Sequence, residues 1–225
     1  MAASRLLTRW INFLAHDRFW ALVGRRRPGS PESEINLEHS SKPEKLIMEP
    51  VAQTFRFCPR CGVAAETVGE NPFRCSGCDL NFFFGPCTAV AGIICDRAGQ
   101  VLFIRRQKDP GKGKLGLPGG FLDAGESIED ALRREILEEI NLQVIGMKYL
   151  ASFPNEYTYR GVTLPVTDVF FQCDVESFDD IAAQESEVAG WHFCHPDASM
   201  YGELAFESHR LAIKEHLRRT EPEAK

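Results

Sequence analysis

Three glutamates in one short stretch have the spacing of a divalent-cation site. Glu135, Glu138 and Glu139 are three and four residues apart, which places their carboxylates on one face of a helix. Like charges this close repel one another, so an isolated helix would not favour the arrangement. Mg²⁺ or Mn²⁺ would remove the repulsion, because hard cations prefer oxygen ligands. We therefore predict that this helix binds a hard divalent cation.

The flanking residues predict how that helix is positioned. A tight turn at Pro118-Gly119-Gly120 precedes it, and Ser127 has the character of an N-cap with Asp130 three residues on. Arg134 lies about two helical turns from Glu126, so an ion pair between them could brace the loop against the helix. A stripe of apolar residues should bury the opposite face; it consists of Ile128, Leu132, Ile136 and Ile140.

The same stretch resembles the Nudix box. The matching residues are Gly120, Glu126, Arg134-Glu135-Ile136, Glu138-Glu139 and Leu142. One position departs, since Asn141 stands where the family pattern has glycine; Asn tolerates the left-handed conformation that ends a helix there. The resemblance implies an α/β/α sandwich with a mixed sheet over residues 87–220. It also implies a hydrolase of nucleoside diphosphates linked to another group.

The resemblance further implies roles for the box residues. Glu135 and Glu139 correspond to recurrent metal ligands, with Glu138 as a further carboxylate, and Glu126 and Arg134 correspond to the bracing pair. The general base varies within the family between a box glutamate and a glutamate in a later loop. Here Glu185 and Glu187 occupy such a loop, and we prefer Glu187.

Two cysteine pairs predict a second metal site. Cys58-x2-Cys61 and Cys75-x2-Cys78 are separated by thirteen residues, and two such knuckles can bring four thiolates around one Zn²⁺. A segment of this size cannot build a core of its own, so metal binding would supply its folding free energy. We therefore predict a small zinc ribbon over residues 51–86, with a closed structural site.

Composition limits the remaining possibilities. The chain has 225 residues and a formal net charge of −6, which argues against nucleic acid or an anionic membrane as a general partner. The four other cysteines are scattered, as expected in a reducing compartment such as the cytoplasm, and no apolar run has membrane-spanning length. A homodimer is left open.

Residues 1–50 read as an extension and linker outside the chemistry. Residues 1–27 contain six arginines and one acid on an amphipathic pattern. They could be an organelle transit peptide, a membrane-surface helix or an extension without a chemical role. Translation from Met1 or from Met48 would retain both motifs.

The rest of the chain predicts strands and a closing helix. Residues 87–95 and 100–105 read as a hairpin, 143–153 as a strand, 154–161 as a polar aromatic loop, 166–175 and 191–193 as further strands, and 203–219 as a helix.

These observations favour metal-dependent hydrolysis of a pyrophosphate bond in a nucleoside diphosphate derivative such as ADP-ribose or NADH. Arg106 and Tyr157 are candidate substrate-binding residues, and Phe153 and Tyr159 could also stack on a base. A zinc ribbon before a Nudix domain resembles the NADH pyrophosphatases, but the Ser-Gln-Pro-Trp-type stretch of those enzymes is missing here. The alternative is a non-catalytic nucleotide-sensing Nudix domain, with the ribbon as its partner- or nucleic-acid-binding arm.

Overall fold

The computed structural model describes residues 48–220 of the chain. The basic helix expected within residues 1–27 and most of the expected linker lie outside these residues. The elements are β1 (Glu49–Pro50), α3 (Val51–Thr54), β2 (Phe73–Arg74), β3 (Asn81–Phe82), β4 (Cys87–Ile94), β5 (Val101–Arg106), β6 (Leu115–Gly116), β7 (Gly119–Phe121), α4 (Ile128–Ile140), β8 (Val144–Tyr159), β9 (Val162–Val175), β10 (Val188–Cys194), the 3-10 helix η1 (Ala198–Gly202) and α5 (Glu207–Thr220).

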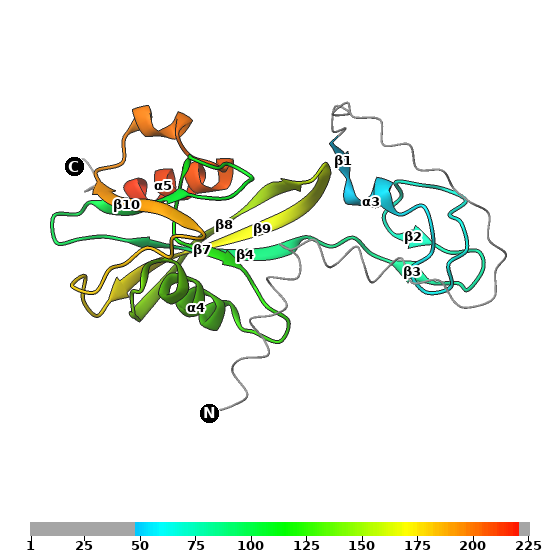
Figure 1. The fold of residues 1–225 in the computed structure, drawn as a ribbon, viewed down its shortest axis with the longest axis horizontal. Helices are drawn as coiled ribbons and strands as arrows, with labels where there is room; N and C mark the ends of the chain where they lie inside the picture. The colour runs from blue at the N-terminus through cyan, green and yellow to red at the C-terminus, as the bar shows by residue number, and fades with distance from the viewer. Residues whose placement is uncertain (1–47, 221–225) are drawn as a thin grey trace. The chain divides into compact units, whose positions relative to one another are not determined.

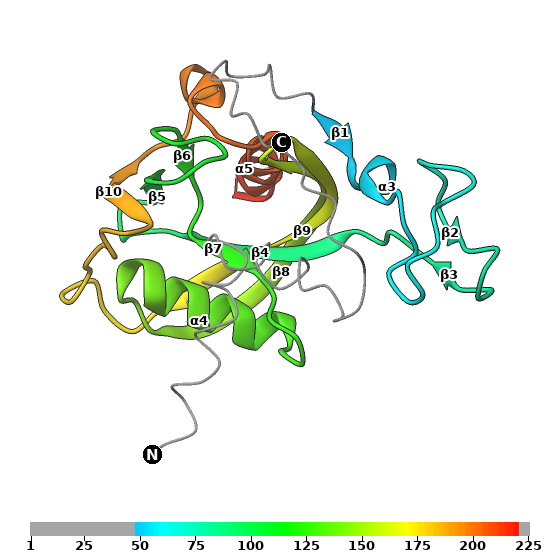
Figure 2. The ribbon, with the colours of Figure 1, turned by 45° about the vertical axis from the view of Figure 1, so that its right-hand side comes forward.

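A mixed five-stranded sheet forms the centre of the domain that follows the cysteine pairs, and it also includes the short strand β1. Strand β9 pairs in parallel with β4 and β1 and antiparallel with β8, and β4 pairs antiparallel with β7. Helix α4 covers one face of this sheet and α5 the other (Figures 1 and 2). The expected α/β/α sandwich with a mixed sheet is therefore confirmed.

The strands β4 and β5 do not form the expected hairpin. The turn between them exists, with Asp96 N–H donating to the Gln100 carbonyl at 2.9 Å, but only the Cys95–Val101 bridge joins the two segments. Beyond the turn, β5 enters a second sheet in the order β10-β5-β6. The hairpin prediction was wrong because the edges of β4 are taken by β9 and β7, and these pairings join residues distant in sequence.

The segment predicted as a polar aromatic loop is also a strand. Strand β8 continues through Pro154 to Tyr159, and the chain reverses only at Arg160-Gly161, where φ is +48° and +84°. Strand β9 then pairs back along almost the whole length of β8. The long antiparallel pairing provides hydrogen-bond partners for the backbone N–H and C=O groups of these residues, although their polar side chains by themselves favour a loop. Tyr157 therefore lies on a paired strand and not in a loop.

The box helix forms as its sequence predicts. Ser127 caps it by accepting a hydrogen bond from Asp130 N–H at 3.1 Å, and Asn141 ends it in the left-handed conformation with φ of +54°. Its apolar side packs on the sheet with Leu132, Ile136 and Ile140 fully buried. The opposite core, below α5, contains Phe103, Leu117, Leu150, Phe170 and Ile213.

Among the described residues, no helix combines the length and apolar character needed to cross a bilayer.

Candidate active site and zinc centre

The four cysteines of the two knuckles lie together. Their sulfur atoms all lie within 4.8 Å of one another, with 3.7 Å between Cys58 and Cys78 and 3.5 Å between Cys61 and Cys75. Four sulfurs at about 2.3 Å from a tetrahedral zinc ion would be separated by about 3.8 Å. The arrangement therefore fits Zn²⁺, and it supports the predicted zinc ribbon.

The knuckle backbones explain how the thiols converge. Gly62 N–H donates to the Cys58 carbonyl at 2.9 Å, and Asp79 N–H donates to the Cys75 carbonyl at 3.0 Å. Gly62 and Asp79 both have positive φ, at +77° and +56°. Asp79 supplies the left-handed residue of the second knuckle. A small apolar cluster of Phe73, Phe84 and Phe55 packs beside the cysteines.

The loop before α4 is braced by Arg134 and Glu126. The guanidinium donates from Nε and Nη2 to the two carboxylate oxygens at 2.8 and 2.9 Å, and Nη2 also donates to the Phe121 carbonyl at 3.2 Å. The hydrogen bonds from Arg134 hold the pKa of Glu126 below its usual value. The pair thus ties the end of β7 and the loop after it to the middle of α4.

Two of the three box glutamates are buried, and the third is not. Glu135 and Glu139 are 9% and 6% exposed, whereas the side chain of Glu138 is 47% exposed. Within residues 48–220, the four cysteines are the only set of three or more ligands whose atoms all lie within 4.8 Å. The three box carboxylates are therefore on one helix face without converging as closely as the thiols do.

For both buried carboxylates, desolvation outweighs the nearby groups that favour the ionised form. Burial raises the pKa of Glu135 to about 7, although Arg134 donates to its Oε1 at 2.8 Å. Burial also raises the pKa of Glu139 to about 8, although the hydrogen bond from Gly119 N–H at 2.8 Å lowers that pKa by stabilising the ionised form. Paired carboxylates that are desolvated in this way fit a hard divalent cation, because its charge would stabilise their ionised forms.

The Gly119-Gly120 turn lies directly against these carboxylates. Gly119 has a φ of +145°, and a Cβ atom there would lie 2.1 Å from the Val90 carbonyl oxygen. A Cβ atom at Gly120 would lie 2.6 Å from the Glu135 carboxyl group. Both glycines are therefore needed for β7 to pass between β4 and α4.

The later loop is attached to the box helix and brings the charge of Glu187 within electrostatic range of the box carboxylates. Gln184 N–H donates to the Glu139 carbonyl at 2.9 Å, so this loop is attached to the end of α4. The negative charge of Glu187 contributes to raising the pKa of both Glu135 and Glu139. Its carboxylate pairs with Lys108 Nζ at 2.7 Å, while Glu185 is exposed. Glu187 therefore stays the predicted base, with Glu185 as the alternative in the same loop.

An aromatic surface adjoins the same site. The Tyr157 ring makes an edge contact with Phe121 at 5.1 Å between centroids and is stacked against Phe206 at 6.4 Å and 28°. The Arg106 guanidinium lies 5.0 Å from the centre of the Phe206 ring. Phe153 instead packs against Phe170 in the core. Sequence reasoning missed Phe206 and Phe121, since no spacing links them to Tyr157.

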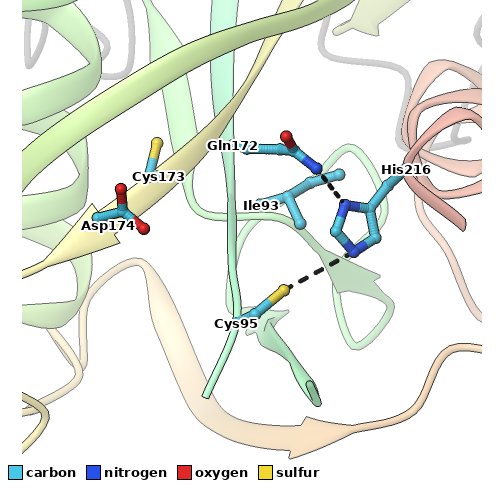
Figure 3. Close-up of a pocket in the computed structure, with 6 residues that line it drawn as sticks. All are labelled: Ile93, Cys95, Gln172, Cys173, Asp174 and His216. Atoms are coloured by element: carbon cyan, nitrogen blue, oxygen red, sulfur yellow. Dashed lines mark hydrogen bonds between the residues drawn. The ribbon is translucent and has the colours of Figure 1, made fainter. Parts of the chain in front are cut away.

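A separate pocket lies on the α5 side of the sheet. It has a volume of about 210 Å³ and is lined by Ile93, Cys95, Gln172, Cys173, Asp174 and His216. His216 lies between Cys95 Sγ at 3.7 Å and the Gln172 amide at 2.9 Å (Figure 3). Burial raises the pKa of Cys95 and lowers that of His216, so the pair is neutral. It lacks the thiolate of a nucleophilic cysteine.

Comparison with known proteins identifies the family of the domain. The model of the NUDIX domain matches residues 85–214, more than half of the chain. An ADP-ribose pyrophosphatase from Methanocaldococcus jannaschii is 33% identical over 60% of this chain and 76% of its own length. An NAD-capped RNA hydrolase NudC from Haemophilus influenzae is 28% identical over 60% of this chain, and the match spans only half of that relative.

Solved structures show the same fold. The NUDIX domain of Shewanella oneidensis NrtR, determined with ADP ribose, matches 62% of this chain and 91% of its own with a TM-score of 0.51 and 24% identity. A NUDIX hydrolase from Nitrosomonas europaea matches 60% of this chain and 90% of its own with a TM-score of 0.51 and 21% identity. The box residues, the sandwich and these matches together establish that the chain belongs to the Nudix family.

Proposed function

We propose that this protein hydrolyses a pyrophosphate bond in a nucleoside diphosphate derivative with the help of Mg²⁺ or Mn²⁺. The observation that carries the proposal is the pair of buried carboxylates, Glu135 and Glu139, facing the Gly119-Gly120 turn. Burial raises their pKa values, so a bound cation would stabilise the ionised form of each carboxylate. The names of the relatives, an ADP-ribose pyrophosphatase and NAD-capped RNA hydrolases, support the reaction class.

Glu135 and Glu139 would hold the cation, and the more exposed Glu138 would supply a third carboxylate. A divalent cation in this place would neutralise phosphate oxygens and activate a water molecule for attack. Arg134 and Glu126 keep the loop in register with the helix and make no contact with the reacting atoms in this scheme. Because Arg134 also donates to Glu135 Oε1, it orients that carboxylate.

Glu187 is the proposed general base. In the reaction, a water oxygen forms a bond to one phosphorus while the bridging P–O bond breaks, and Glu187 takes the water proton. The leaving phosphate carries the bonding electron pair, so two phosphate products result. Lys108 pairs with Glu187 at 2.7 Å, and we propose that its ammonium group also contacts a substrate phosphate.

The aromatic surface of Tyr157, Phe206 and Phe121 is the proposed site for the base of the nucleotide. Any base offers a flat π-face, and the partly exposed Tyr157 and Phe206 rings are nearly parallel. Arg106 beside Phe206 would pair with a phosphate or with the base. These features support a nucleotide and do not distinguish ADP-ribose from NADH.

The test is product release from a panel of ADP-ribose, NADH, NAD⁺, diadenosine polyphosphates and nucleoside triphosphates, with Mg²⁺ or Mn²⁺ and with chelator. We expect cation-dependent cleavage of a nucleoside diphosphate derivative, and nearly complete loss of turnover in Glu139→Gln with the fold intact. Tight binding without cleavage would instead support the nucleotide sensor. Unchanged turnover in Glu139→Gln would refute the site assignment.

A further inference from the structure

A buried histidine of α5 contacts the backbone that leads into the box. His209 is 8% exposed, and its Nδ1 accepts a hydrogen bond from Leu117 N–H at 3.1 Å across 92 residues of sequence. Because Nδ1 is the acceptor, the ring carries its proton on Nε2. No motif in the sequence points to this residue.

The segment Leu117–Gly119 connects this histidine to a box carboxylate. Pro118 has no N–H group, so the segment offers two backbone donors. Leu117 N–H donates to His209 on α5, and Gly119 N–H donates to Glu139 Oε2 on α4 at 2.8 Å. The Pro118 carbonyl accepts from Gly92 N–H at 2.9 Å, which attaches the middle of the segment to β4. The three hydrogen bonds together fix the segment between the two helices.

The surroundings of His209 keep its imidazole in one state and one orientation. The ring makes an edge contact with Phe170 at 5.4 Å and 89° and lies 5.4 Å from Phe206. Burial, assisted by the positive charge of Arg106, lowers the pKa of His209 to about 3. The imidazole is therefore neutral near pH 7, and its Nδ1 stays an acceptor.

We propose that His209 is a positioning residue of the active site, which holds Leu117–Gly119 so that Gly119 N–H can fix the Glu139 carboxylate for the cation. This inference rests on the proposed function, because it assumes that Glu139 is a cation ligand. Groups that orient a ligand from outside the coordination shell change metal affinity or activity by about 10- to 100-fold when they are removed. His209 acts one step further away, through the backbone.

The experiment compares two substitutions at one position. His209→Phe keeps an aromatic ring but removes the acceptor, whereas His209→Asn places an amide oxygen where Nδ1 lies. Mn²⁺ binding is measured without substrate by electron paramagnetic resonance on the full chain. Zinc is kept in the ribbon, whose thiolates bind zinc in preference to a hard ion such as Mn²⁺. The kcat and KM values and thermal unfolding are measured on the same samples.

We expect His209→Phe to weaken Mn²⁺ binding and to lower kcat by about tenfold, the low end of the range for orienting groups, with a much smaller change in KM. His209→Asn should restore most of both quantities. The matched control is His216→Phe, seven residues further along α5, because His216 is also buried but bonds to Gln172 and Cys95. That control should lose stability while its Mn²⁺ affinity stays unchanged.

Equal Mn²⁺ affinity in wild type and His209→Phe would overturn the positioning role, as would an equal loss in His216→Phe. A wild-type chain that binds no Mn²⁺ would instead refute the proposed function. If His209→Phe does not fold, His209→Gln replaces it, because its amide lies one bond further from the backbone. An Mn²⁺ affinity near that of the wild type in His209→Asn and a weaker one in His209→Gln would support the proposal. The same affinity in both variants would contradict it.

Discussion

Arg134 and Glu126 form a bidentate ion pair between the middle of the box helix and the loop that precedes it. Nε donates to Oε1 at 2.8 Å, and Nη2 donates to Oε2 at 2.9 Å. The same guanidinium reaches the Phe121 carbonyl and the Glu135 carboxylate. One side chain thus connects the last residue of β7, the loop and a proposed cation ligand.

Arg134→Lys should destabilise the protein by about 1–3 kcal/mol, because a single ammonium cannot replace the planar fork and leaves partly buried acceptors unpaired. Chemical denaturation measures the change. Arg133→Lys is the matched control, since Arg133 is exposed on the same turn and makes only a 3.3 Å hydrogen bond to the Glu129 carbonyl and a 3.9 Å contact with Asp130. A similar loss in both variants would show that Arg134 has no special bracing role.

The metal-free protein should become less stable as the pH rises. The folded-state pKa values of Glu135 and Glu139 are about 7 and about 8, above the ordinary value of 4.5. The folded state therefore holds these protons after the unfolded chain has released them, so stability falls between about pH 4.5 and 8. We expect Glu139→Gln to flatten this fall and to raise the melting temperature at pH 8.

Cation affinity should change in the opposite direction. Ligand carboxylates must release their protons, so Mg²⁺ and Mn²⁺ should bind more tightly as the pH rises from 6 to 9. Titrations of the metal-free protein at several pH values check this, with Glu176→Gln as an exposed control outside the site. Stability and cation affinity that are both independent of pH in this range would contradict the burial argument.

Glu187→Gln should lower kcat by about 10²- to 10⁴-fold, the usual contribution of a general base. Glu185→Gln, in the same loop but exposed, should change kcat little. The ion pair of Glu187 with Lys108 is largely exposed, so either variant should unfold at nearly the wild-type temperature. Loss of activity in Glu185→Gln alone would reverse the assignment, and activity in both would place the base within the box.

Phe206→Leu should raise KM more than it lowers kcat, because a stacked base contributes about 1–3 kcal/mol of binding. Steady-state kinetics on the best substrate of the panel measures both constants. Phe153→Leu is the comparison, since Phe153 packs in the core against Phe170. That variant should lose stability with little change in KM, and the reverse pattern would move the base site away from Phe206.

Each chain should bind one zinc ion through the ribbon. Serine at any one of Cys58, Cys61, Cys75 or Cys78 should reduce the zinc content and expose residues 51–86 to proteolysis, because the apolar cluster around Phe73 is small. Cys87→Ser should retain the zinc, since Cys87 is exposed and lies outside the set. Elemental analysis and limited proteolysis provide the readouts, and full zinc content in Cys75→Ser would refute the four-thiolate site.

Several local features of this protein could be predicted from spacing alone. The cap at Ser127, the left-handed end at Asn141, the Arg134–Glu126 pair and the convergence of the cysteines all appear in the structure. Each involves residues within one helix, one loop or one short segment. Helical periodicity and turn chemistry govern such contacts, and both can be read from neighbouring residues.

The pairings between distant segments were decided by the tertiary structure. Strand β8 extends through Tyr157 because β9 pairs with it, and the loop that contains Glu187 is attached by hydrogen bonds to the end of α4. Phe206, directly before α5, and His209, on α5, come from about seventy residues beyond the box. Spacing along the chain cannot encode these contacts, because they depend on sheet order and on which face each helix covers. The sequence alone determined which residues could bind metals, and only the folded sheet decided which other side chains lie beside them.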